Sequence, residues 1–147
     1  MHSVRIAKRV WLPLGAALIF AISPLGSYSG IAAAADIKVT LAGDQEVPPV
    51  KSAGTGTGTI IIGTDKSVSG SVTSTGIAGT AAHIHEAAPG KNGPVIVPLT
   101  KNGDTYAVPA GAKLTDAQFA SFQAGNLYVN VHTAANPGGE IRGQLKP

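Results

Sequence analysis

The 147-residue sequence contains no cysteine, which excludes disulfide bonds, thiolate metal ligands and lipid attachment at a cysteine. No serine stands beside a histidine in a triad-like context, so nucleophilic hydrolysis is not indicated. The glycine-rich stretches lack a following helix and a Lys-Ser/Thr pair, which argues against a phosphate-binding loop. Packing alone must therefore hold the fold together.

The N-terminal third differs in character from the rest of the chain. Residues 1–9 carry three basic residues and no acidic one, the run 10–22 is uncharged, and alanines follow at 32–35. This pattern predicts a secretory signal peptide over residues 1–35, cleaved near Ala34 or Ala35. The run is shorter than the ~20 apolar residues of a spanning helix, and the C-terminus has no apolar tail or sorting signal. We therefore expect a secreted, periplasmic or extracellular product that leaves the membrane after cleavage.

The net positive charge of the whole chain belongs to this leader. It contains three of the eleven basic residues and none of the eight acidic ones, so residues 36–147 carry eight of each. A neutral domain gives no support for binding to nucleic acid or to an anionic membrane.

Residues 36–147 are long enough for one domain with a single core, and short alternating segments run through them. Gly/Pro/Asn turns separate these segments, and one capping box, Thr115 to Gln118, predicts a helix of at most two turns that ends before Gly125. We predict an all-β domain, an antiparallel β-sandwich of the Ig-like or Greek-key type with one short helix. The expected strands cover residues 37–41, 54–62, 67–74, the segment around 81–86, 95–97, 106–108, 126–133 and 139–146.

The glycines at positions 54, 56 and 58 alternate with threonines and lead into three isoleucines. A flexible linker is one interpretation. The favoured one is a strand whose bare face lets another backbone or side chain approach closely.

Three of the four histidines lie in the domain: His83 and His85 in one segment and His132 in another. Side chains alternate across a strand, so His83 and His85 share a face about 7 Å apart along the strand. Two such imidazoles can hold one metal ion if a neighbouring strand supplies a third ligand.

When the inward positions of three segments are assigned to the core, their outward positions form one polar face. Pairing 126–133 with 139–146 through the loop 134–138 places His132 opposite Glu140 and Asn130 opposite Arg142. If the His83 strand lies alongside, three imidazoles converge, with Glu86 or Glu140 as candidate outer-shell partner or fourth ligand. The polar face comprises His83, His85, Tyr128, Asn130, His132, Glu140, Arg142 and Gln144.

Two interpretations of this face remain open. It can be an ordinary polar outer surface, in which the histidines only form hydrogen bonds to neighbours. Arg142 and Glu140 are expected to form a structural ion pair and not to be catalytic groups. Alternatively, His83, His85 and His132 form a mononuclear copper or zinc site, and neutral imidazoles do not choose between these two ions.

Several motifs in the domain occur in the order typical of one family. They are Leu41–Val50 (LAGDQEVPPV), Ala82–His85 (AHIH), Pro89–Val95, Gly125–Thr133 (GNLYVNVHT) and Pro137–Leu145 (PGGEIRGQL). Across roughly residues 37–145 the chain resembles the CHRD domain family, named after chordin. The resemblance implies an all-β extracellular module without an established biochemical activity. Glu86 stands where the family usually has glycine.

The segment His83-Ile84-His85 is also similar to the copper-ligand strand of copper-zinc superoxide dismutases. A dinuclear site of that kind needs about six histidines and an aspartate, so dismutase chemistry by that mechanism is disfavoured. We expect a binding module with a metal site and assign no enzymatic activity. The alternative is a structural module without metal, in contact with a protein or cell-surface polymer.

Overall fold

The computed structural model describes residues 34–147; the predicted signal peptide lies outside the described residues except for its last two positions. No helix among the described residues is long and apolar enough to cross a membrane. Nine strands, one short 3-10 helix η1 (Gly43–Gln45) and one α-helix α1 (Asp116–Gln123) make up the domain. The strands are β1 (Ala35–Ala42), β2 (Thr55–Ile62), β3 (Val68–Thr75), β4 (Gly79–Glu86), β5 (Val95–Pro98), β6 (Thr100–Asn102), β7 (Thr105–Ala107), β8 (Leu127–Thr133) and β9 (Ile141–Leu145).

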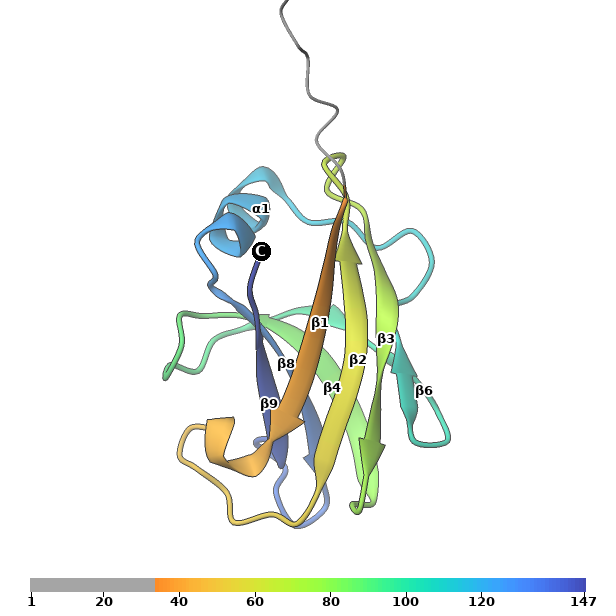
Figure 1. Ribbon diagram of the computed structural model, residues 1–147, viewed down its shortest axis with the longest axis vertical. Coiled ribbons are helices and arrows are strands. Elements are labelled where there is room, and N and C mark those ends of the chain that lie inside the picture. Colours follow the sequence, from red (N-terminus) through yellow and green to blue (C-terminus); the bar gives the residue numbers. More distant parts are fainter. Residues whose placement is uncertain (1–33) are drawn as a thin grey trace, which may run out of the picture. The chain divides into compact units, whose positions relative to one another are not determined.

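The strands form a single antiparallel sheet in the order β5-β4-β8-β9-β1-β2-β3-β7-β6 (Figure 1). β1 and β9 pair at one position, Ala42 with Arg142, whereas the other neighbours pair over longer stretches. The outermost strands β5 and β6 follow one another in the chain, and between them the Leu99 amide donates to the Ala82 carbonyl of β4 at 3.0 Å. The sheet is therefore nearly closed, and the predicted all-β architecture with one short helix is confirmed.

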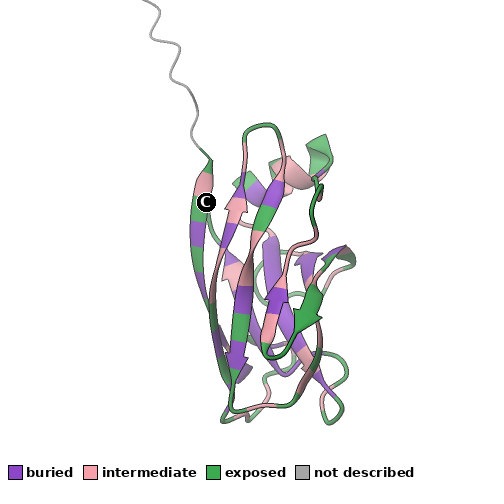
Figure 2. Cartoon of the chain, turned by 90° about the vertical axis from the view of Figure 1, so that its right-hand side faces the viewer, coloured by how far each residue is buried: buried purple, intermediate pink, exposed green. Residues whose placement is uncertain are grey.

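One hydrophobic core lies inside this folded sheet (Figure 2). Every second residue of β1 is buried, and β8 is buried along almost its whole length. Alternation on an antiparallel strand sends one set of side chains inward, as the sequence predicted for β4, β8 and β9. The core includes Ile37, Val39, Leu41, Ile60, Ile62, Val68, Val72, Ala82, Ile84, Val97, Tyr106, Leu127, Val129, Val131, Ile141 and Leu145.

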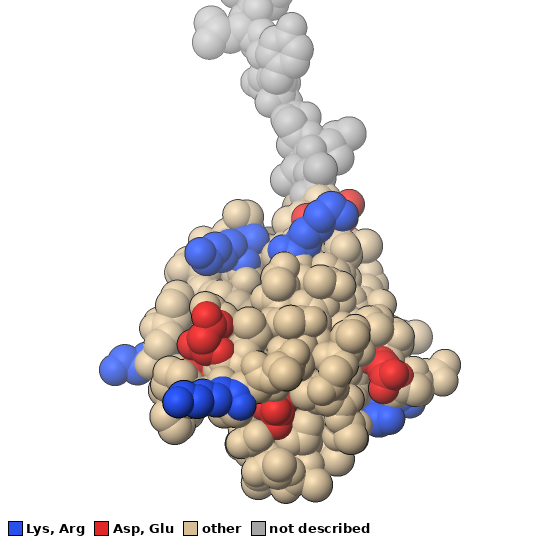
Figure 3. Space-filling view, turned by 60° about the horizontal axis from the view of Figure 1, so that its bottom comes forward, with Lys and Arg blue, Asp and Glu red and all other residues tan. Residues whose placement is uncertain are grey.

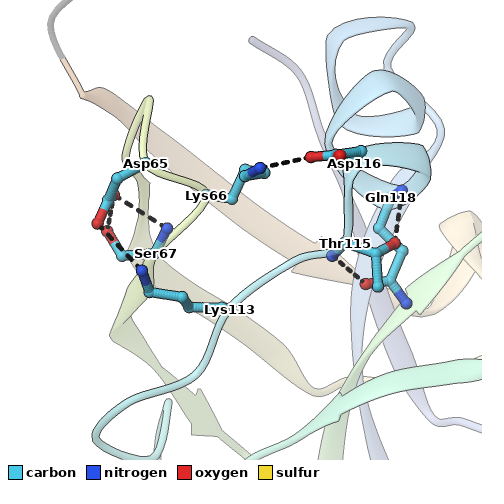
Figure 4. Close-up of polar contacts among 7 residues, drawn as sticks. All are labelled: Asp65, Lys66, Ser67, Lys113, Thr115, Asp116 and Gln118. Carbon is cyan, nitrogen blue, oxygen red and sulfur yellow. Dashed lines mark hydrogen bonds and ion pairs between the residues drawn. The ribbon is translucent and has the colours of Figure 1, made fainter.

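Helix α1 begins at the predicted capping box (Figure 4). The Thr115 hydroxyl accepts from the Gln118 amide at 3.2 Å, and the Gln118 side chain accepts from the Thr115 amide at 2.9 Å. Lys66, in the turn between β2 and β3, forms an ion pair with Asp116 in the first turn of the helix. Because a negative charge at a helix N-terminus also complements the helix dipole, these contacts fix where α1 starts and tie it to the turn.

Glycines at positions 56 and 58 occupy the inward face of strand β2, as expected from the favoured interpretation of the Gly/Thr alternation. A Cβ on Gly56 would lie 3.1 Å from Ile141 Cδ1, and a Cβ on Gly58 would lie 2.6 Å from Val72 Cα and closer still to the Ser71 carbonyl. The linker interpretation of residues 54–58 is therefore wrong, because the missing side chains let β3 and the core approach β2.

We predict that Gly58→Ala destabilises the domain by about 1–3 kcal/mol, since the new methyl group would overlap backbone atoms of β3. The matched control is Gly138→Ala, whose Cβ would meet nothing within 4 Å and should change stability by no more than about 0.5 kcal/mol. Urea unfolding monitored by circular dichroism measures both. Equal stability of the two variants would contradict the packing described for β2.

Candidate metal centre

The polar residues of the three strands β4, β8 and β9 gather on the side of the sheet opposite the core. In the observed register His83 pairs with Asn130, His85 with Tyr128, and Asn130 with Arg142. The Asn130–Arg142 pairing is the one predicted from the sequence. β8 lies between β4 and β9, so the histidine strand is adjacent to the Asn130 strand as expected.

His83, His85 and His132 form one cluster on this face. One ligand atom from each imidazole can be chosen so that all three atoms lie within 4.8 Å of one another. The ring centroids are 4.8 Å apart for His83 and His132, 5.7 Å for His83 and His85, and 6.1 Å for His85 and His132. The three predicted ligands are thus brought together at distances that a single ion can span.

The hydrogen bonds of the cluster determine which ring nitrogens carry lone pairs. A carbonyl can only accept, so His85 donates from Nδ1 to the Gly93 carbonyl at 2.9 Å, and His132 donates from Nδ1 to the Pro137 carbonyl at 3.0 Å. In both neutral rings the lone pair is then on Nε2. The His132 lone pair accepts from His83 Nδ1 at 2.9 Å, whereas His85 Nε2 is buried without a hydrogen-bond partner among the described residues.

Burial and mutual repulsion lower the pKa values of His83 and His85. Burial lowers the pKa of His83 below its ordinary value of 6.5, and positive charge on His132 or His85 would lower it further. Burial also lowers the pKa of His85, although the hydrogen bond to Gly93 opposes this effect. Neutral imidazole is the form that binds a metal, so this environment favours the ligand state at neutral pH.

The face is not an open outer surface, because a polar stack and a loop cover it. The Tyr128 ring stacks on His85 at 4.8 Å with an interplanar angle of 7°, and Arg142 Cζ lies 3.4 Å from the Tyr128 ring centroid. Asn92, in the loop 87–94, donates to the Val47 carbonyl at 2.7 Å and accepts from Arg142 at 3.3 Å. As a result Arg142 is only 1% exposed and Tyr128 2%.

The two carboxylates proposed as extra ligands are engaged elsewhere. Glu86 accepts from the Ser121 hydroxyl at 2.5 Å. Glu140 accepts from the Thr133 hydroxyl at 2.8 Å and from the Asn136 amide, and hydrogen bonds from Ser52, Asn136 and Thr133 lower the pKa of its carboxyl. Neither carboxylate joins the three-histidine group within the described residues.

The expected ion pair between Arg142 and Glu140 does not form; in the described part of the chain the ion pairs are Lys66–Asp116 and Lys113–Asp65. β9 begins only at Ile141, after Gly139 has turned the backbone with a φ of +137°. Glu140 therefore does not continue the alternation of β9, and it bonds to Thr133, the neighbour of His132 on the opposite side of β8.

Sequence analysis missed one buried carboxylate, Glu46, which follows η1. Glu46 is 5% exposed, and burial raises the pKa of its carboxyl, while the charge of Arg142 and the neighbouring Asn130 amide act in the opposite direction. The prolines at 48 and 49 indicated a loop, but nothing in the pattern indicated that this loop folds back over the polar face.

Fold and site together define an all-β domain with a three-histidine cluster on one sheet face. The family model described as CHRD domain matches residues 37–145, which is most of the chain. The chain therefore belongs to the CHRD domain family. Neither the curated proteins nor the solved structures contain a significant match to it.

We predict that His83 and His85 contribute less to the stability of the metal-free domain as the pH falls from about 7 to about 5. His83 and His85 have lowered pKa values in the folded state, so the unfolded chain takes up protons first, below its ordinary pKa of 6.5. The stability that these neutral rings contribute is present above pH 6.5 and is lost as the pH falls through their folded pKa values.

A His83→Gln/His85→Gln variant should lack this pH-dependent stabilisation. The difference in unfolding free energy between parent and variant should therefore change between about pH 7 and about pH 5. Urea unfolding in the presence of a chelator measures it at each pH. Glu46, whose raised pKa has the opposite effect on stability, is present in both proteins and cancels in the difference. A difference independent of pH would contradict the environment described for the histidines.

Proposed function

We propose that this CHRD domain binds one transition-metal ion through His83, His85 and His132. The observation that carries the proposal is the buried, unpartnered Nε2 of His85, a residue that offers a ligand atom within 4.8 Å of those of the other two imidazoles. A buried polar atom without a partner costs free energy, and coordination to an ion would remove that cost. The carbonyls of Gly93 and Pro137 support the proposal, because such second-shell bonds orient metal-ligating histidines.

Copper or zinc suits this donor set best. Three neutral imidazoles without a thiolate or thioether favour these borderline ions over the hard cations Mg²⁺ and Ca²⁺, which prefer oxygen ligands. A protonated imidazole has no lone pair for a metal, so metal affinity should fall as the pH drops through the pKa values of His83 and His85.

We further propose that the domain acts as a secreted binding module outside the cytoplasm, with a protein or a cell-surface polymer as partner. The leader pattern in residues 1–35 supports export. Acidic and basic side chains are few and interspersed on the face in Figure 3, which favours neither nucleic acid nor an anionic membrane as the partner.

Protein purified without an affinity tag should contain close to one equivalent of copper or zinc, or should bind one of them at micromolar concentration. A His83→Ala/His85→Ala/His132→Ala variant should bind none, because all three nitrogen ligands are gone. Elemental analysis after dialysis measures the content, and competition with a chromophoric chelator measures the affinity.

The matched controls for this experiment are Glu86→Gln and Glu140→Gln. Both carboxylates already accept hydrogen bonds from other side chains, so we expect metal affinity to change less than about threefold, within the range of indirect effects. A parent that neither contains nor binds copper or zinc would leave the interaction module without metal as the better function.

Export predicts a shortened N-terminus. N-terminal sequencing of protein recovered from the medium or the periplasm should find a start at or next to Ala35, because signal peptidase cleaves after small residues. An intact leader on a product that needs detergent would instead indicate a membrane anchor.

A further inference from the structure

Three buried side-chain atoms near the histidine cluster have no hydrogen-bond partner within the described part of the chain. They are Glu46 Oε1, Asn130 Oδ1 and His85 Nε2. The three residues are 5%, 1% and 8% exposed, so solvent does not compensate for the missing partners. Each such atom is costly by itself. Asn130 Oδ1 and His85 Nε2 both have lone pairs that a metal ion can accept, and the buried Glu46 carboxylate requires a nearby positive charge.

Asn130 connects the other two residues. A Cβ on Gly139 would meet both Glu46 Oε1 and Asn130 Nδ2, and on β8 Asn130 stands two residues after Tyr128, the register partner of His85. Its register partner on β4 is His83, and it stands two residues before His132 on β8. Asn130 thus adjoins all three imidazoles on the same face of the sheet.

The orientation of the Asn130 amide is fixed from the loop side. Nδ2 donates to the Gly138 carbonyl at 3.4 Å, and a Cβ on Gly139 would lie 2.7 Å from Nδ2 and closer still to Glu46 Oε1. Gly139 therefore leaves the space that the nitrogen end of the amide and the Glu46 carboxylate both border. Because this end faces the loop, Oδ1 is directed toward the histidines.

We propose that Asn130 Oδ1 is the fourth ligand of the ion and that Glu46 is the positioning residue that holds the Asn130 amide. This inference rests on the proposed three-histidine site and completes it as an N₃O set. With four protein ligands the site is closed, which is typical of structural or binding sites rather than of catalytic ones.

The ion would also account for the burial of Glu46. Four neutral ligands leave the charge of a divalent ion uncompensated, and the carboxylate behind Asn130 supplies an opposite charge in a poorly solvated place. Arg142, which is buried on the same face, contributes a positive charge that Glu46 also offsets.

The test compares the parent with Asn130→Ala, Asn130→Asp and Glu46→Gln, and uses Asn102→Ala in the exposed strand β6 as the matched control. Zn²⁺ affinity is measured by competition, and the visible absorption of bound Co²⁺ reports the ligand set. We expect Asn130→Ala to weaken Zn²⁺ binding by about 10- to 100-fold and to change the Co²⁺ spectrum, the loss seen when metal-site residues are removed.

Asn130→Asp should restore Zn²⁺ affinity to at least the parent value, because a carboxylate oxygen replaces the amide oxygen, and it should give its own Co²⁺ spectrum. Glu46→Gln should weaken binding but keep the parent Co²⁺ spectrum, since Glu46 does not touch the ion. Asn102→Ala should match the parent in both measurements. If Asn130→Ala fails to fold, Asn130→Asp still tests the proposal. A Co²⁺ spectrum of Asn130→Asp identical to that of the parent would show that Asn130 is not a ligand.

The two proposals fail in different ways. If the parent binds Zn²⁺ through its histidines but Asn130→Ala keeps both affinity and spectrum, Asn130 is not a ligand and the three-histidine site stands. If the parent binds no metal at all, the three-histidine site and the fourth ligand are both wrong.

Discussion

The alternation of side chains along β4, β8 and β9 is the constraint on which the site depends. β8 is paired with β4 on one side and with β9 on the other. This pairing places its core residues on one face of the sheet and its polar residues on the other face. A slip of one residue in either pairing would turn Val129 and Val131 out of the core and the histidine face into it. The free energy of burying the core therefore also holds the imidazoles, Tyr128 and Asn130 in place.

Local patterns in the sequence were sufficient to predict every strand except β6, together with helix α1 and the three-histidine cluster. The capping box, the glycine face of β2 and the register of Asn130 with Arg142 all depend on residues close in sequence or on strict period-two alternation. The short strand β6 was not predicted, because its three residues are all exposed and carry no alternation.

These local patterns could not predict the contacts made by the loops. The prolines after Glu46 indicated an irregular segment, but its path depends on Asn92, some 45 residues later, donating to the Val47 carbonyl. For the same reason the polar face was expected to be exposed, whereas Arg142 and Asn130 are each 1% exposed. Glu140 was misplaced because one glycine with a positive φ interrupts the alternation that the prediction assumed.

The near closure of the sheet affects the tendency of this protein to aggregate. An open sheet offers two unpaired edges to which strands of other molecules can add, and proteins limit this with short or proline-containing edge strands. Here the outermost strands β5 and β6 have four and three residues, β5 ends in Pro98, and Leu99 between them bonds back to β4. A domain without disulfides thereby gains protection against edge-to-edge aggregation from its topology.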